Sequence, residues 1–527
     1  MSTITASRRG VLAGMTALAL PAAFLPRPAA AQQKPFTVML ESEVVILDPH
    51  MTTAAITRTF AYHVFDMLYG SDAKGQIHPQ MVETQEVSAD QLRWQFTLRP
   101  GMRFHDDTPV TAADCIASLA RWAPRDALGR MLLAAGATMA AQGERVFTIT
   151  LTKPFPLMLN VLGKPNAPLP AIMPARVAAA AGEGRIKEVI GSGPFRFAAD
   201  RWRVGDSMVL ARFDRYVPRP EPADFLSGGK AVQVPEVVLR TIGDDGTGAS
   251  ALVAGEIDYM QYLPFDLVPM LARSQGVQVM TLKGLDMFQG NFRVNAASGP
   301  FADPAVRAVL WQLVDQKEML QAAGIAPDLR MDHCAAFFMC DAPLASDAGA
   351  ANARFDPAAG KAALARTGYK GEPVVMLQVS ASISQAAGSM LAQRMREAGF
   401  TVDEQVMDWG TVLQRRGRKE GWSIFPVYSN GVDMASPLTH FYISNNCGDY
   451  PGWSCSEPMS ALLTQFAAAP DDAARARIAA AIQEDAYRTT PSVMWGQFSR
   501  PAGYRTRLQG LVQSSYPIFW GVRLGNA

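Results

Sequence analysis

The sequence predicts an α/β protein with more than one domain, and three observations carry this prediction. The chain has 527 residues, more than one hydrophobic core usually serves, so two or three domains are expected. Short apolar or alternating segments, typical of strands, recur between segments with helical periodicity. Hydrophobic residues make up 49% and charged residues 18% of the chain, which is a globular composition.

The charge pattern excludes some classes of partner. The formal net charge is +1, and basic and acidic residues are interspersed along the chain. A surface for a nucleic-acid backbone or an anionic membrane needs a concentration of Lys and Arg. The sequence therefore favours neither of these partners.

The first 31 residues predict a twin-arginine-like export signal instead of part of the fold. Arg8 and Arg9 precede an apolar run, Val11–Leu25, and small residues at 29–31 form a cleavage pattern. The run is shorter than a bilayer-spanning helix, and Arg27 fits the twin-arginine route. The cleavage point has no cysteine, so a lipid anchor is not indicated. We expect cleavage near Ala31 and a soluble, periplasmic mature protein.

The first elements of the fold follow from their periodicity. Phe36–Leu40 is predicted to be a buried opening strand, and Ala61–Gly70 places apolar residues on one face of a helix. Val146–Leu151 alternates as a half-buried strand does. Strands and helices thus alternate from the beginning of the chain, as the α/β class requires.

A hairpin and a capped helix are predicted next. Leu92–Arg99 alternates strictly, Pro100-Gly101 forms a turn, and Met102–His105 resumes the alternation. Thr111 and Asp114 have the spacing of a capping box, so a helix is expected to begin there.

His105, Asp106 and Asp107 stand side by side after this hairpin and raise the question of a metal or acid–base site. Adjacent residues in a turn mostly point apart, whereas metal ligands must converge. The remaining histidines show no complementary spacing: His50, His63, His78, His333 and His440. We interpret the two aspartates as turn-forming residues that bond to their own backbone, and no metal site or cofactor is expected.

The cysteines fit an oxidising compartment. Cys334 and Cys340 bracket one short loop, and Cys447 and Cys455 bracket another. Two short-loop disulfides are the favoured arrangement, although four cysteines allow three pairings. Cys115 lies on an apolar helical face and is expected to be a buried thiol.

Sequence motifs of exported hydrolases are absent. The chain contains no Gly-x-Ser-x-Gly elbow and no His-Glu-x-x-His motif. The segment that begins at Gly243, GDDGTG, lacks the Lys-Ser/Thr of a phosphate loop. An enzyme is therefore not expected, and an exported hydrolase is kept as a remote alternative.

One long segment resembles a known family. FTLRPGMRFHDDTPVTAADC, residues 96–115, with the following Ser-Leu-Ala-Arg, resembles the signature of the extracellular solute-binding proteins of family 5. These are the dipeptide-, oligopeptide- and nickel-type periplasmic receptors of ABC importers. Asp107 replaces the usual glycine. Further segments agree with the family in order: LDPH at 47–50, GSGPFRF at 191–197, GEID at 255–258, residues 295–316, residues 355–369 and residues 395–416.

The resemblance implies a two-lobe periplasmic-binding-protein fold of type II with a hinge and an extra subdomain inserted in lobe one. Lobe one is expected over residues 32–285, with the inserted subdomain over about 81–189. Lobe two is expected over 286–489, and residues 490–527 are expected to return to lobe one. The signature segment would then lie in the inserted subdomain, away from the cleft between the lobes.

The resemblance also implies candidate ligand residues. In peptide-binding members an aspartate of lobe two pairs with the peptide's ammonium group, and Asp433, flanked by Tyr428, lies in the corresponding region. The spacing between the two is longer here than in typical peptide binders. Further candidates for the wall of the cleft are three aromatic residues and one residue of the loop after the first strand: Trp409, Phe288, Trp495 and His50.

The family implies a monomeric binding component that captures a peptide or similar amine-bearing solute and delivers it to the permease subunits of an ABC importer. An opine, a glycoside, haem or a metal chelate remain alternative solutes. The same fold can also present its ligand to a sensor. If Asp433 meets a buried cation, Asp433→Asn is expected to cost about 3–5 kcal/mol of binding free energy.

Overall fold

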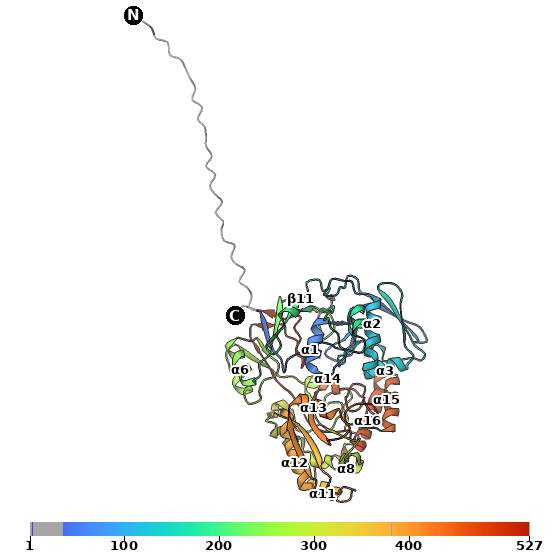
Figure 1. Cartoon of the computed structure of the whole chain (residues 1–527), viewed down its shortest axis with the longest axis vertical. Coiled ribbons are helices and arrows are strands. Elements are labelled where there is room, and N and C mark those ends of the chain that lie inside the picture. Colours follow the sequence, from blue (N-terminus) through green and yellow to red (C-terminus); the bar gives the residue numbers. More distant parts are fainter. Residues whose placement is uncertain (1–2, 4–34, 381, 526–527) are drawn as a thin grey trace. The chain divides into compact units, whose positions relative to one another are not determined.

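Two mixed sheets form the framework of the fold in the computed structural model, which describes residue 3, residues 35–380 and residues 382–525 (Figure 1). The predicted export signal and its cleavage site lie outside the described residues, save for Thr3. The chain divides into residues 1–34 and the unit Pro35–Ala527, and the following description concerns the second unit.

The first sheet has seven strands in the order β10-β11-β12-β1-β13-β21-β14. β1 runs parallel to β12 and β13, while β21 runs antiparallel to β13 and β14. Its strands are β1 (Phe36–Met39), β10 (Phe195–Phe197), β11 (Ser207–Arg212), β12 (Glu236–Arg240), β13 (Tyr259–Met260), β14 (Val277–Met280) and β21 (Ala502–Arg505). The part of the chain built on this sheet is called lobe one below.

Helices of lobe one include α1 (Ala55–Val64), α5 (Ala175–Ala181), α6 (Asp245–Ala254) and α7 (Val268–Leu271). β1 is buried along its whole length, as its apolar sequence predicts. The sequence predicts a helix over 61–70, but the helix in the structure, α1, ends at Val64, because Phe65 adopts extended backbone angles. Short strands follow it there: β2 (Asp66–Met67) and β3 (Tyr69–Ser71).

The second sheet has six strands in the order β16-β20-β15-β19-β17-β18. Its strands are β15 (Phe288–Val294), β16 (Arg330–Met331), β17 (Val374–Val379), β18 (Val402–Met407), β19 (Ile424–Asn430) and β20 (Ser492–Phe498). β15 and β20 lie in the middle of the sheet and are buried at all seven positions of each. The part of the chain built on this sheet is called lobe two below.

Lobe two carries most of the long helices. α12 is typical: Ser382 caps its N-terminus, and Gly399 ends it with φ at 112°, a conformation that favours glycine. The helices of this lobe are α8 (Pro304–Ala308), α9 (Leu310–Leu313), α10 (Gln316–Ala322), α11 (Pro357–Leu364), α12 (Ile383–Ala398), α13 (Trp409–Arg416), α14 (Gly431–Met434), α15 (Glu457–Ala468) and α16 (Asp472–Thr489).

A third, four-stranded antiparallel sheet lies within residues 82–150, in the order β5-β6-β8-β7. Its strands are β5 (Val82–Val87), β6 (Arg93–Leu98), β7 (Thr138–Ala141) and β8 (Val146–Thr150), and the neighbouring helices are α2 (Ala112–Trp122), α3 (Ala127–Ala134) and α4 (Met158–Gly163). Small two-stranded pairs complete the described strands: β2 with β9 (Ala171–Ile172), β3 with β4 (Ile77–Pro79), and β22 (Leu508–Gln509) with β23 (Arg523–Leu524).

The predicted hairpin has different partners in the structure. β6 pairs with β5 and β8, and not with the residues that follow Pro100-Gly101. Met102–Phe104 instead folds back on Thr108–Val110, through a bridge between Arg103 and Pro109. Alternation alone identified a strand without identifying its neighbours: β5, which directly precedes β6, pairs with one edge of it, and β8, farther along the chain, pairs with the other.

The chain passes between the two large sheets twice, between β14 and β15 and between β20 and β21. The two passages are joined, since the backbone N–H of Leu282 donates to Ser499 Oγ at 3.2 Å. β20 still belongs to the six-stranded sheet, so the return to lobe one comes after Phe498, whereas the sequence expectation placed it at about residue 490. Pairing of β20 with β15 accounts for this difference.

Among the residues that the structure describes, no helix combines the length and the apolar character needed to cross a bilayer.

Candidate functional site

A buried ion pair joins the two lobes. Arg58 of α1 directs its guanidinium at Asp433 of α14, with Nη1–Oδ1 at 2.5 Å and Nη2–Oδ2 at 2.6 Å. The two side chains are only 2% and 3% exposed. α1 and α14 are therefore in direct contact across the lobe boundary (Figure 1). We call this pair and the residues that bond to it the latch.

Two further side chains of lobe one complete the latch. Asn166 Nδ2 donates to Asp433 Oδ1 and also to the carbonyl of Val432 at 3.2 Å. The Tyr516 hydroxyl donates to Asp433 Oδ2 at 3.2 Å, and the Arg58 guanidinium lies 4.0 Å above the Tyr516 ring. Both carboxylate oxygens of Asp433 therefore have partners, as a buried charge requires.

The electrostatics of the latch favour the charged pair. Burial alone would lower the pKa of Arg58, but the attraction of Asp433 outweighs it and raises that pKa. Tyr62, which lies beside Arg58, has its pKa raised, first by burial. The phenol therefore stays neutral, and the guanidinium has Asp433 as its counter-ion.

A cavity of about 130 Å³ lies at the lobe boundary, near enough to the latch for Arg58 to act on the Glu41 carboxyl in its lining. Lobe one contributes residues that follow β1 and β13 and the first turn of α6, lobe two contributes Tyr428 of β19, and the second passage contributes Arg500. The lining residues are Met39, Leu40, Glu41, Asp245, Met260, Tyr262, Tyr428 and Arg500. We call this space the charged cavity. The carboxyl ends of parallel strands are the usual place for ligands in α/β proteins.

Arg500 is held on one side of the charged cavity by two tyrosines. Its guanidinium lies 3.8 Å above the centroid of the Tyr262 ring, and its Nη1 donates to the Tyr428 hydroxyl at 3.1 Å. Burial alone would lower the pKa of Arg500. The two tyrosines and the carboxylates of Glu41 and Asp245 outweigh this effect and raise that pKa.

Glu41 is the acidic counterpart. It follows β1, and its backbone N–H donates to Gln261 Oε1 at 3.0 Å, which fixes the backbone at the rim of the cavity. The side chain lines the cavity and is exposed to solvent at its rim. Partial desolvation by the neighbouring protein raises the pKa of Glu41, against the opposing influence of Arg500 and Arg58.

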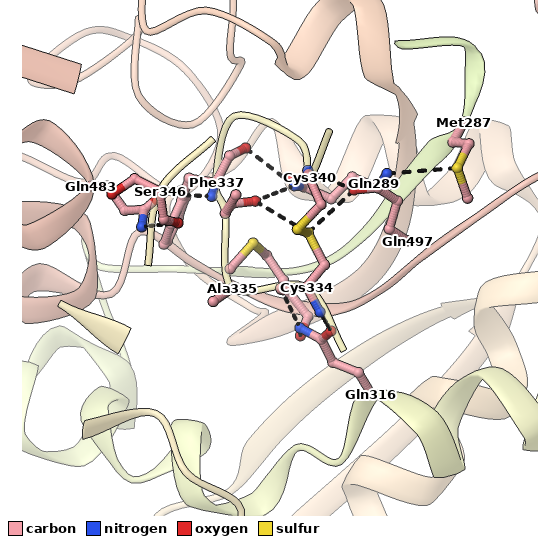
Figure 2. Close-up of a disulfide and its surroundings, with 12 residues drawn as sticks. Met287, Gln289, Gln316, Cys334, Ala335, Phe337, Cys340, Ser346, Gln483 and Gln497 are labelled. Carbon is pink, nitrogen blue, oxygen red and sulfur yellow. Dashed lines mark hydrogen bonds between the residues drawn. A yellow bond between two sulfur atoms is a disulfide. The ribbon is translucent and has the colours of Figure 1, made fainter. Parts of the chain in front are cut away.

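A disulfide loop supports the helix that carries Asp433. The loop runs from Cys334 to Cys340, which are joined by a disulfide, and Figure 2 shows that glutamine side chains hold its backbone. The glutamines are Gln316 of α10, Gln497 of β20, Gln289 of β15 and Gln483 of α16.

Met339 of this loop is fully buried in a cluster with Met287 and Met434. Gly431, the first residue of α14, lies so close to Met339 that a Cβ there would come within 2.6 Å of the Met339 methyl group. The loop therefore packs directly against the start of α14 and fixes the position of Asp433.

The second pair, Cys447 and Cys455, is also joined, and Cys115 is a free, buried thiol. Both disulfides have the short-loop arrangement that the sequence favours. Burial, with a smaller contribution from Asp114, raises the pKa of Cys115, so the thiol stays protonated.

The structure brings some of the expected ligand residues to the lobe boundary and places others elsewhere. Tyr428 lines the charged cavity, and Asp433 lies in the latch. Phe288 is buried directly against Tyr428, with ring centroids 5.6 Å apart. Trp495 is fully buried and donates to the carbonyl of Val427. Trp409 is 41% exposed at the beginning of α13.

His50 is fully buried in lobe one, where its ring Nε2 contacts the Ala171 carbonyl at 2.9 Å. Burial lowers its pKa to about 4, so the ring is neutral at neutral pH. Its environment is the core of lobe one. The ligand roles of these six residues stay predictions.

The run His105-Asp106-Asp107 forms a turn next to residues 191–193. His105 Nε2 lies 3.0 Å from the Gly193 carbonyl, and burial lowers the pKa of His105 to about 4. Asp106 Oδ1 accepts from Thr108, as a turn-forming aspartate does. Asp107 has φ at 68°, the left-handed region that favours glycine. The described residues contain no cluster of His, Cys, Asp and Glu suited to a metal ion.

Several residues of the latch and the charged cavity escaped prediction from the sequence. Arg58 had a signal, because it is the one Lys or Arg in a helix without any Asp or Glu, and a buried charge needs a partner. Glu41 had a weaker one, as the first polar residue after the opening strand. Asp245 and Arg500 had no such signal in the sequence, because only the folded chain brings them to Tyr262.

Comparison with known proteins gives the family context. A family model described as "Bacterial extracellular solute-binding proteins, family 5 Middle" matches residues 76–452. The "Probable peptide ABC transporter periplasmic-binding protein y4tO" of Sinorhizobium fredii is 32% identical over 538 residues, which cover 99% of this chain and all of that protein. The "Glutathione-binding protein GsiB" of Escherichia coli K12 is 25% identical over 316 residues, 59% of this chain and 57% of that protein.

Solved structures share the fold. The "PBP AgaA in complex with agropinic acid" from A. tumefaciens R10 aligns with a TM-score of 0.78 and 22% identity, over 94% of this chain and 99% of that one. The dipeptide-binding protein of Pseudoalteromonas sp. SM9913, in complex with Met-Leu, aligns with a TM-score of 0.79 and 16% identity, over 93% and 100%. At these identities the likeness establishes the fold, which is that of the two-lobe periplasmic binding proteins.

Proposed function

This chain belongs to the bacterial extracellular solute-binding proteins of family 5, and from that premise we propose that it captures a peptide or similar amine-bearing solute for an ABC importer. The proposed action is binding between the two lobes, followed by delivery to the permease subunits in the inner membrane. The peptide assignment rests on the name of the relative from Sinorhizobium fredii, which covers almost the whole chain.

One structural observation supports the proposal above the others. A polar cavity lies where the two lobes meet, and residues of both lobes and of a passage between them line it. Closure around such a space removes a solute from water, which strengthens each polar contact with it. A binding protein needs this arrangement, whereas a hydrolase also needs a nucleophile with its base.

The test is thermal unfolding of the purified mature protein with and without peptides and other amine-bearing solutes. We expect a ligand-dependent rise in melting temperature, because a ligand that binds only the folded state stabilises it by mass action. The ligand is expected to be recovered intact. Turnover of the ligand in amounts above that of the protein would contradict a role in binding alone.

Native mass spectrometry of the protein as purified adds a second measurement, since a closed cleft can retain its solute. It also reports the mass of the mature chain, which tests cleavage near Ala31, and the proposed monomeric state. Export through the twin-arginine route is tested by Arg8→Lys/Arg9→Lys, which is expected to leave the precursor in the cytoplasm.

A further inference from the structure

Asp433 is already occupied by a cation of the same chain. Arg58 binds both carboxylate oxygens, and Asn166 and Tyr516 bond to them as well. A solute ammonium could reach this carboxylate only by displacing a guanidinium that makes two charge-assisted hydrogen bonds. The latch therefore satisfies Asp433 without a solute.

The charged cavity has the opposite property, because its charges are close together but unpaired. Among the described residues, no ion pair of 4 Å or less joins Arg500 to Glu41 or Asp245. Arg500 Nε has no hydrogen-bond partner there either. Both carboxylates are nevertheless near enough to raise the pKa of Arg500. Opposite charges thus face one another across a space.

The size of this space limits what it can hold. Its volume of about 130 Å³ corresponds to roughly four molecules of liquid water at ~30 Å³ each. Pockets for drug-sized ligands measure about 300–1,000 Å³. A single amino acid is of the right order of size, and an oligopeptide is too large for this space.

We propose, on the premise of the function given above, that the solute is an amino-acid-sized molecule that binds in the charged cavity and not at Asp433. Its cationic nitrogen faces Glu41 and Asp245, and its carboxylate faces Arg500. Two carboxylates opposite one guanidinium favour a solute with one more positive than negative charge, such as a dibasic amino acid. Tyr262 and Tyr428 flank the aliphatic part.

The first experiment follows thermal unfolding with two defined probes at equal concentration. One is a mixture of the standard protein amino acids with ornithine, and the other is a tryptic digest of casein freed of amino acids. We expect the melting temperature to rise with the first probe and not with the second. A rise with the digest alone overturns the inferred solute class and leaves the proposed function intact.

No rise with either probe also overturns the inferred solute class. The proposed function fails only if a small-molecule extract of bacterial cells gives no rise either, so the two failures are distinguishable.

The second experiment measures the affinity of the amino acid that gives the largest rise. Glu41→Gln and Arg500→Gln each remove one charged contact and are expected to weaken binding about 10- to 100-fold. Glu43→Gln is the matched control, because it removes the same charge two residues away and outside the cavity, and its affinity is expected to be unchanged. Equal affinities of the Glu41 variant and the control overturn the assignment.

The third experiment separates the latch from the solute site. Arg58→Gln exposes the Asp433 carboxylate to any cation in the cleft, and we expect no gain in affinity for the casein peptides. A gain of tenfold or more in this variant would assign Asp433 to a solute ammonium and overturn the proposal.

Discussion

The latch and the charged cavity lie side by side at the lobe boundary, and both contain arginine, carboxylate and tyrosine, yet they differ in one respect. In the latch every carboxylate oxygen of Asp433 is bonded and the side chains are almost fully buried. In the charged cavity Glu41 and Asp245 face Arg500 across open space without an ion pair. Residue composition alone would not tell the two apart.

The difference separates a structural role from a binding role. A desolvated pair whose carboxylate oxygens are all bonded contributes to which conformation forms and leaves no acceptor free for a solute cation. A guanidinium that tyrosines hold in place, with carboxylates near it but no ion pair, is preorganised for a partner that brings the missing groups. The predictions below test this contrast, from the largest expected effect to the smallest.

Breaking the latch is expected to have the largest effect on the free energy of unfolding. Asp433→Asn or Arg58→Gln leaves the other charge buried without its partner, which costs about 3–5 kcal/mol of the free energy of unfolding. The double variant removes both charges, and we expect it to recover more than half of that loss. Urea denaturation of the single and double variants gives the coupling free energy.

Arg201→Gln is the control for the latch, since Arg201 makes a bidentate but exposed pair with Glu236 and its loss is expected to cost about 1 kcal/mol or less. Losses of the same size at the buried and the exposed pair would contradict the structural role given to the latch.

The disulfide loop supplies the next largest effect, because Met339 packs against α14 and so supports the latch from lobe two. Cys334→Ser/Cys340→Ser opens a loop with a sequence separation of 6, and the expected loss is about 2 kcal/mol. The matched control is Cys447→Ser/Cys455→Ser, a loop of similar length with a separation of 8. We expect only the first variant to reduce the coupling between Arg58 and Asp433.

Acid is expected to weaken the binding of the solute in the charged cavity. The pKa of Glu41 is raised by desolvation, so its carboxylate is neutralised at a higher pH than that of a free glutamate. The groups that face it are Arg500, Arg58, Asp245 and the tyrosines. The affinity for a cationic solute should therefore fall as the pH falls through this raised pKa, by up to about tenfold per pH unit.

The sign for stability is opposite, because a raised pKa in the folded state means that protonation of Glu41 favours folding. Weaker binding in acid would then not result from a loss of folded protein caused by the protonation of Glu41. Calorimetric titration across the pH range measures the affinity, and Glu41→Gln is expected to flatten its pH dependence. An equal slope in the wild type and the variant would assign the effect to another group.

Much of the fold could be predicted from the sequence because local patterns carry it. The buried opening strand, the strand at Val146 and the capping box of Thr111 and Asp114 follow from periodicity and capping chemistry. The partner of β6 and the point of return to lobe one could not be predicted. The pairing of β6 with β8 and of β20 with β15 joins segments far apart in the chain, which no local pattern encodes.

The candidate site could be predicted only where one residue carried a family pattern. Asp433 and Tyr428 were identified in that way, and both lie at the lobe boundary. The cation at Asp433 was expected to come with the solute, whereas the structure supplies Arg58 from α1. Asp245 and Arg500 belong to segments more than 250 residues apart, and only folding places them on one cavity.

The smallest effect is expected at a third charged cluster, the turn at Asp107, which lies in neither of the two regions. A non-glycine residue at φ near 68° costs about 1 kcal/mol, and the exposed contact between Asp107 and Arg215 returns at most a part of it. Asp107→Gly should therefore raise the free energy of unfolding by up to about 1 kcal/mol without changing solute affinity. Urea denaturation and calorimetric titration measure the two quantities. A loss of solute affinity would mean that this turn takes part in binding. The charged cavity would then no longer be the one charged region assigned to the solute.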